Sequence, residues 1–192
     1  MFVRIILLAI AFVGLSACSD KKIVQNICNK DIELNETEIY SKIAKYWLEN
    51  SKYLFDGKDI IIYNKTHSLK DNHPNISLEN QSKNLTFDTS SVEDFHEKNQ
   101  ESVLLDKALN LTTQYQYLSP ETKFYKKDLA KDFINTYPNA ATLIGFSRIG
   151  FNEDYSKAIL YSYSTFDRGS YIELERQNCE WKIKQEHILW HH

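Results

Sequence analysis

The sequence predicts an α+β domain in which N-terminal helices pack on a C-terminal four-stranded antiparallel β-meander, with one or two additional strands. Three observations lead to this class. Apolar residues recur at helical spacing early in the chain and again near residue 130. From residue 142 onward, four runs have the composition of β-strands and are separated by short turn sequences. Because the helical patterns precede the strand runs instead of alternating with them, we expect the helices on one face of the sheet.

The first helical pattern covers residues 36–51. Asn35 with Glu38 three residues later resembles a capping box at its start. The apolar stripe that follows consists of Ile39, Ile43, Tyr46 and Trp47.

The middle of the chain combines short elements with a long polar segment. Residues 59–64 are a β-rich block that indicates a buried strand. Residues 65–90 are rich in Asn, Ser and Lys, which predicts a long surface excursion. The later patterns predict a short helix over 94–100 after a start at Ser91, and a strand over 112–118. A further helix is predicted through Leu129, Phe133 and Tyr137, and it ends at Pro138.

The meander is the clearest part of the pattern. Its four predicted strands cover residues 142–151, 157–166, 170–176 and 181–190. The connections at 152–154, 167–169 and 177–178 have turn compositions. Side chains alternate between apolar and polar along the last two runs, which indicates strands with one buried face.

The N-terminus has the composition of a bacterial lipoprotein signal. Residues 1–17 contain one positive charge, a short apolar core and small residues before Cys18. The apolar core would span only about 15 Å as a helix, roughly half of a bilayer core, so it is too short for a transmembrane anchor. Leu-Ser-Ala-Cys looks like a lipobox, at which Cys18 receives a diacylglyceryl group; an ordinary signal peptide with a nearby cysteine is the alternative.

This signal predicts a location and a domain division. We expect a signal peptide at 1–17, a lipidated tether at 18–30 and a single domain at 31–192. Each buried lipid CH₂ contributes about 0.8 kcal/mol, so several acyl chains hold a protein at a membrane. The lipid on Cys18 would place the domain in the cell envelope, facing the periplasm. By analogy with lipoprotein sorting, Ser19 favours the outer membrane.

The composition bears on the partners. Removing Arg4 with the signal leaves 22 Lys and Arg against 26 Asp and Glu, a formal charge near −4. Phosphate binding needs a basic face, so we expect no nucleic acid partner. Gly-rich phosphate loops and zinc-type cysteine pairs are also missing from the sequence, and we expect no cofactor.

The cysteine count predicts one disulfide. With Cys18 lipidated, Cys28 and Cys179 are left in an exported protein, where disulfides persist. Their bond would close a loop of about 150 residues and could stabilise the fold by up to about 5 kcal/mol. Two unpaired buried thiols are the alternative, whereas a nucleophile or metal ligand would need a surrounding cluster that neither cysteine has in the sequence.

The C-terminal half resembles a family of proteins. The residues that carry the resemblance are those at 146–152, 157–161, 169–174 and 181–183, with further counterparts at 60–66, 94–99 and 137–138. They are similar to a widespread group of small exported bacterial proteins, many with lipobox signals, that share Ser-Arg-Ile/Val-Gly-Phe-Asn and a later Gly-x-Tyr-x-x-Leu. The group has no settled activity, so the resemblance implies no catalytic role. Cys179 departs from the pattern, which more often has glycine there.

The shared stretch contains the candidate binding residues Ser147, Arg148 and Asn152. They could form a recognition cluster at a strand–turn junction. The structural alternative, which we favour, is that Gly150 permits a bulge, Asn152 caps the turn and Arg148 pairs with a carboxylate.

Among the histidines, His96 is the best candidate for a general base, because it lies on a predicted short helix between acidic residues. His67 and His73 lie in the polar excursion and are expected to be solvated. His187, His191 and His192 could form at most a weak adventitious metal site, so no metal is expected.

Three hypotheses follow for the function. The favoured one is a non-catalytic envelope lipoprotein that binds a protein partner, for example as an inhibitor or immunity protein, through the sheet face or the 65–90 segment. The second is a hydrolase that acts on cell-wall or lipid substrates with His96, Arg148 and a carboxylate. The third is a structural or assembly factor of the envelope.

Overall fold

The computed structural model describes residues 28, 31–51, 55–70, 87–119, 122 and 129–191. Within these residues it contains three α-helices and a seven-stranded mixed sheet, so the α+β class is confirmed. The elements in chain order are α2 (Ile32–Asn50), β1 (Asp59–Ile62), α4 (Thr89–Lys98), β2 (Tyr115–Tyr117), α5 (Leu129–Thr136), β3 (Ala140–Phe146), β4 (Gly150–Phe151), β5 (Lys157–Ser164), β6 (Arg168–Gln177) and β7 (Glu180–His191).

Several predicted features lie outside the described residues. These are the signal at 1–17, Cys18, most of the tether at 18–30, His73 and His192. None of the described helices is long and apolar enough to cross a membrane.

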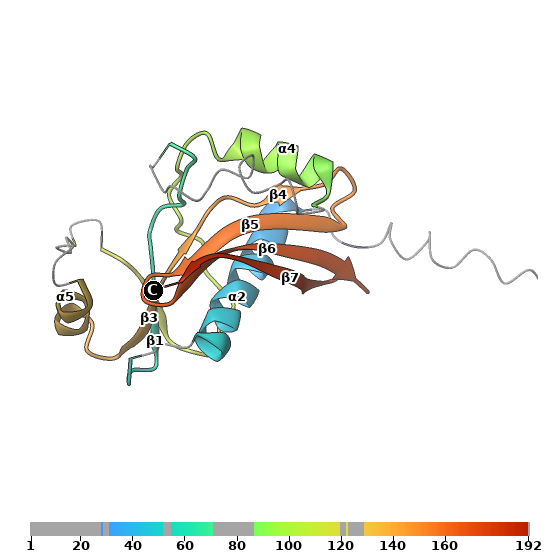
Figure 1. The fold of residues 1–192 in the computed structure, drawn as a ribbon. Helices are drawn as coiled ribbons and strands as arrows, with labels where there is room; N and C mark the ends of the chain where they lie inside the picture. Colours follow the sequence, from blue (N-terminus) through green and yellow to red (C-terminus); the bar gives the residue numbers. More distant parts are fainter. Residues whose placement is uncertain are drawn as a thin grey trace, which may run out of the picture.

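The sheet combines parallel and antiparallel pairs in the order β2-β1-β3-β5-β6-β7, and β4 pairs with β5 beside this path. β1 pairs in parallel with β2 and β3. β3, β5, β6 and β7 pair antiparallel in succession (Figure 1). The predicted run 142–151 is divided into two strands, because residues 147–149 interrupt the regular ladder between β3 and β4.

Helix α2 begins earlier than the capping-box pattern predicts. Asp31 is its N-cap, and the Asp31 carboxylate accepts hydrogen bonds from the backbone N–H groups of Glu33 at 2.9 Å and Leu34 at 3.3 Å. The prediction of an Asn35 cap was wrong, because Asp31 offers the same kind of side-chain oxygen one turn earlier. The additional turn buries Asn35 beside the sheet.

The apolar stripe of α2 packs on one face of the sheet. Ile39, Ile43 and Trp47 are fully buried, and the Trp47 indole donates a hydrogen bond to Ser162 Oγ at 2.7 Å. The strand residues in this part of the core include Ile60, Ile62, Ile144, Leu160, Ile172 and Leu174.

Helices α4 and α5 cover the other face of the sheet. Phe95 of α4 packs against Ile159 and Tyr161, and Phe133 of α5 packs in a cluster with Ile61. Adjacent residues of a strand point to opposite faces, so these clusters lie across the sheet from α2. The helices are therefore divided between two faces, which differs from the expected single helical layer.

A buried ion-pair network joins the C-terminal end of α2 to β6 and β7. Arg168 donates hydrogen bonds from Nε to Glu186 Oε1 at 2.9 Å and from Nη1 to Asp167 Oδ2 at 2.6 Å. Burial acts to raise the pKa of Glu186, but hydrogen bonds from Arg168, Tyr46 and Ser170 outweigh it and lower this pKa. Because buried charges are costly when unpaired, each member depends on the others.

Candidate functional site

Residues 147–149, in the most motif-like stretch of the sequence, form a β-bulge. Arg148 and Ile149 stand opposite the single residue Leu160 of β5, because the pairing register shifts by one residue between β3 and β4. A bulge removes backbone N–H and C=O groups from the ladder, so they need other partners.

Side chains at the end of α4 supply partners for the bulge. The Asn99 side chain is fully buried; its Oδ1 accepts a hydrogen bond from Arg148 N at 2.8 Å, and its Nδ2 donates to Arg148 O at 3.1 Å. Lys98 Nζ donates to Ile149 O at 3.3 Å. The 94–99 and 147–152 stretches, which the sequence resemblance links, are thus two halves of one interface.

The close approach of α4 requires glycine at position 150. A Cβ atom on Gly150 would lie 2.3 Å from the carbonyl oxygen of Ser91 and 2.5 Å from the backbone nitrogen of Phe95. Beside this glycine, Asp94 Oδ2 accepts a hydrogen bond from Phe151 N at 2.7 Å. We call residues 147–152 the α4 seat, because they hold this helix against the sheet.

The predicted binding residues of the α4 seat bond the protein's own backbone. Ser147 is fully buried, and its Oγ accepts a hydrogen bond from Tyr161 N at 2.8 Å. Asn152 Oδ1 accepts from Ser156 N at 3.0 Å and from Lys157 N at 2.8 Å, which closes the turn before β5. These contacts give both side chains a structural role.

The structure does not bring together His96, Arg148 and a carboxylate, which the hydrolase hypothesis requires. The His96 ring lies edge-on to Phe95 with the centroids 5.9 Å apart. The guanidinium of Arg148 instead donates to Lys98 O at 3.2 Å. Among the described residues, no hydrogen bond joins the His96 ring to Arg148 or to a carboxylate.

A different histidine lies in a polar aromatic cluster. His67 Nε2 and the Tyr163 hydroxyl are 2.5 Å apart, and Tyr63 packs against both rings at centroid distances of 5.6 and 5.9 Å. A Cβ atom on Gly145 would lie 2.3 Å from the Tyr163 ring. Glycine at this position of β3 therefore leaves room for the side chain of Tyr163, which comes from β5. The expectation of a solvated His67 was wrong, because its partner comes from a strand almost a hundred residues later and leaves no local signal.

The cluster continues toward the C-terminal strand. Trp190 Nε1 donates to the Tyr161 hydroxyl at 3.0 Å, beside Gly169, where a Cβ atom would lie 2.4 Å from the same nitrogen. Burial raises the pKa of Tyr161 to about 12 and also raises the pKa values of Tyr63 and Tyr171. Tyr63, Tyr161 and Tyr171 are therefore neutral at physiological pH.

The C-terminal histidines do not form a metal centre in the described part of the chain. No group of three or more His, Cys, Asp or Glu residues there could hold a metal ion. Burial lowers the pKa of His187, whose ring lies against Phe87 with the centroids 4.7 Å apart. His191 is exposed at the end of β7.

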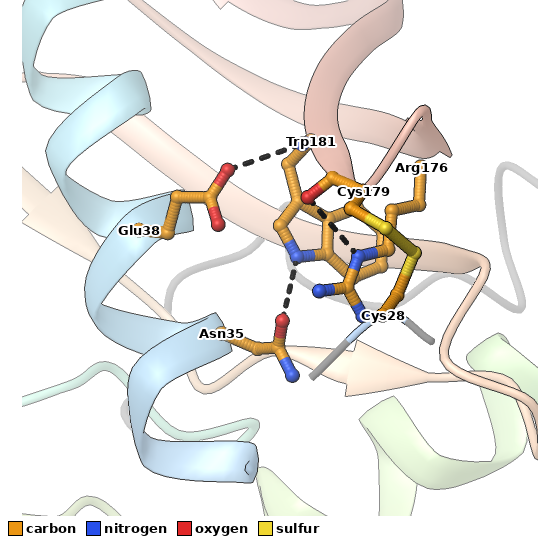
Figure 2. Close-up of a disulfide and its surroundings, with 6 residues drawn as sticks. All are labelled: Cys28, Asn35, Glu38, Arg176, Cys179 and Trp181. Carbon is orange, nitrogen blue, oxygen red and sulfur yellow. Dashed lines mark hydrogen bonds between the residues drawn. A yellow bond between two sulfur atoms is a disulfide. The ribbon is translucent and has the colours of Figure 1, made fainter. Parts of the chain in front are cut away.

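The predicted cysteine pair lies at disulfide distance. The sulfur atoms of Cys28 and Cys179 are 2.06 Å apart, and their Cα atoms are 5.1 Å apart (Figure 2). Asn178 and Cys179 have φ values of 52° and 65°, as in the two-residue type I′ turns that favour glycine at the second position. A non-glycine residue there costs roughly 1–2 kcal/mol, so the turn alone does not favour a cysteine.

The bond lies beside a contact between α2 and the last hairpin. Trp181 is fully buried; its backbone N–H donates to Glu38 Oε1 at 3.1 Å and its indole donates to Asn35 Oδ1 at 3.1 Å (Figure 2). The guanidinium of Arg176 stacks 5.6 Å from the Trp181 ring centroid. The disulfide therefore reinforces a junction that side chains of α2 already form.

Two consecutive apolar residues are exposed beside the first residues of the 65–90 segment. Val103 is 39% exposed and Leu104 is 59% exposed. Their backbone is held by hydrogen bonds from Thr66 N to Val103 O at 2.9 Å and from Val103 N to Thr66 Oγ1 at 3.0 Å, and by a bridge between Leu104 and Lys65. These side chains are thus exposed from an ordered part of the backbone.

Comparisons with known proteins complete the description of the site. No family model matches the chain, and neither the curated proteins nor the solved structures contain a match. The resemblance to the group of small exported proteins stays a prediction, and the α4 seat gives a structural role to one of the stretches that carry it, residues 147–152.

Proposed function

We propose that this chain is a lipid-anchored protein of a bacterial cell envelope whose α+β domain binds a protein partner and catalyses no reaction. In this proposal, the lipid is on Cys18 and the domain faces the periplasm. The lipobox-like sequence supports the anchor. The placement of Arg148 supports binding over catalysis, because its guanidinium donates to Lys98 O and, among the described residues, forms no hydrogen bond with His96 or a carboxylate.

The exposed pair Val103 and Leu104 is the observation that carries the binding proposal. Large apolar side chains that are exposed on a fixed backbone lose little conformational freedom when a partner covers them. The pair adjoins Lys65 and Thr66, where the 65–90 segment begins, so partner binding here agrees with the role expected for that segment.

The faces and the β7 edge of the sheet are less suited to a partner. The two sheet faces are covered by α2 on one side and by α4 and α5 on the other. The edge strand β7 contains Lys182 and Lys184 and two register irregularities, features by which proteins discourage the pairing of edge strands.

The test is photo-crosslinking in cells with a photoreactive residue at Leu104 and, as a matched control, at Ile134, which is exposed on α5. We expect one discrete adduct from position 104 and none from position 134. The substitution Val103→Lys should abolish the adduct without loss of folded protein, since this side chain is exposed. Absence of an adduct under several growth conditions, or equal adducts from both positions, would contradict the proposal.

A hydrolase is the second candidate, and one observation favours it. The His67–Tyr163 pair is an assembled acid–base pair, unlike the set predicted around His96. We rank it second because Tyr163 is only 4% exposed, which restricts the access of a substrate to its hydroxyl.

A further inference from the structure

The N-terminal segment joins the domain at two points that are close together in the sequence. Cys28 is bonded to Cys179 in the turn between β6 and β7. Three residues later, Asp31 caps α2. A pull on the N-terminal segment therefore reaches the disulfide before it reaches the helix.

We infer that the Cys28–Cys179 bond is a mechanical staple, which transmits tension from the N-terminal segment into the β6–β7 hairpin and keeps it off α2. The inference rests on the proposed function in one respect: the lipid anchor is the source of the tension. The staple itself is a property of the folded domain.

The hairpin is well suited to receive this tension. β6 and β7 pair along their whole length, from Gln177 and Glu180 at the turn to Arg168 and His191 at the far end. A force that enters at the turn is shared by two strands, which are backed by the buried side chain of Trp181.

Helix α2 is poorly suited to receive the same force. Its first turn is exposed, with Ile32 44% and Leu34 54% accessible to solvent. The stripe that holds α2 on the sheet begins only at Asn35. A pull at Asp31 would therefore act first on this exposed turn and next on the hydrogen bonds that join Asn35 and Glu38 to Trp181.

The turn gives a second, independent observation. Asn178 and Cys179 both have positive φ, a conformation in which glycine is more favourable than cysteine at the second position. A cysteine that is unfavourable for its turn is explained if the bond to Cys28 provides the advantage.

Single-molecule force spectroscopy tests the staple. The full mature chain would carry one handle in place of the lipid at position 18 (Cys18→Ser) and a second at Lys131, which is exposed on α5. In the Cys28→Ser variant we expect an early step of about 40 Å, before the hairpin opens, because the 19 residues of α2 lengthen from about 1.5 Å to about 3.5 Å each as the helix unwinds. The oxidised parent, which keeps both cysteines, should lack this step.

The double variant Cys28→Ser/Cys179→Gly is the matched control, because glycine relieves the turn without restoring the bond. It should retain the early step. If the step disappears in the double variant, strain in the turn and not loss of the staple explains it, and the inference is overturned. An early step in the oxidised parent, or none in Cys28→Ser, also overturns it.

Reduction of the folded parent with dithiothreitol before pulling provides a second measurement if Cys28→Ser folds poorly. The early step should then appear in the same molecule that lacked it when oxidised, and its absence after complete reduction would contradict the staple. No membrane and no partner protein are present, so a failure here is distinct from a failure of the crosslinking test.

Discussion

Helices α2 and α4 cover opposite faces of one sheet and are held there by different means. α2 inserts a stripe of large apolar side chains, of which Ile39, Ile43 and Trp47 are fully buried. α4 buries one large side chain, Phe95, and is otherwise held by polar groups such as Asn99, which bond a β-bulge. The long helix is held by apolar area, and the short one by hydrogen bonds of defined geometry.

This difference explains why the docking contacts of α2 and of α4 leave different patterns in the sequence. An apolar stripe tolerates exchange among similar side chains and is recognised by its spacing. A polar seat depends on particular residues, since a buried donor or acceptor without a partner costs about 1–3 kcal/mol. The 94–99 and 147–152 stretches therefore resemble a functional motif, although their described contacts are structural.

The largest expected effect is on the α2 side. Trp47→Ala should lower the free energy of unfolding by about 3–5 kcal/mol, because it leaves a large cavity and removes the hydrogen bond to Ser162. Urea denaturation followed by circular dichroism would measure it. A loss below about 1 kcal/mol would show that α2 adds little to the stability of the core.

A smaller and more local effect is expected on the α4 side. Gly150→Ala should destabilise the docking of α4 by about 1–3 kcal/mol, because the added Cβ meets the backbone of Ser91 and Phe95 and the helix must move. Hydrogen exchange of the α4 amides should accelerate while that of α2 stays unchanged. Equal acceleration in both helices would show that they do not unfold independently.

The smallest effect concerns the charge that caps α4. Burial acts to raise the pKa of Asp88, but hydrogen bonds from Lys157, Ser90 and Ser91 outweigh it and lower the pKa to about 2. The folded-state pKa is below the unfolded value, so this stabilisation is complete above about pH 4 and is lost as the pH falls toward 2. We expect a loss of about 1 kcal/mol, because Lys157 is partly exposed and the pair is screened by solvent.

Urea midpoints of the wild-type protein and Asp88→Asn between pH 2 and 5 would measure this contribution. Asparagine still caps a helix but does not titrate there. The difference between the two proteins should shrink as the pH falls through this range. A difference that is independent of pH would mean that the cap contributes no charge-dependent stability.

The elements that could be predicted are those with a local signal. The stripe from Ile39 to Trp47 and the helix through Phe133 follow from residue spacing, and the structure contains both. The strand predicted over 59–64 is present as β1 over 59–62. The cysteine count alone led to Cys28 and Cys179. The start of α2 was misplaced because Asp31 and Asn35 are both good caps, and only the burial of Asn35 against Trp181 distinguishes them.

The candidate sites depend more strongly on tertiary structure. Asn99, His67 and Tyr163 were not singled out as site residues, because each gains its role from a partner far away in the sequence. The glycines at 145 and 150 were the available signal: a glycine inside a strand pattern indicates close approach of another group. Without the fold, nothing shows which group approaches.

The sequence by itself determined the α+β class and the pair Cys28 and Cys179. These follow from composition, spacing and counting, which act locally along the chain. Only the tertiary structure decided that the helices divide between two faces and that Ser147, Arg148 and Asn152 serve the fold. These outcomes depend on contacts between distant segments, whose energies are set by packing in three dimensions.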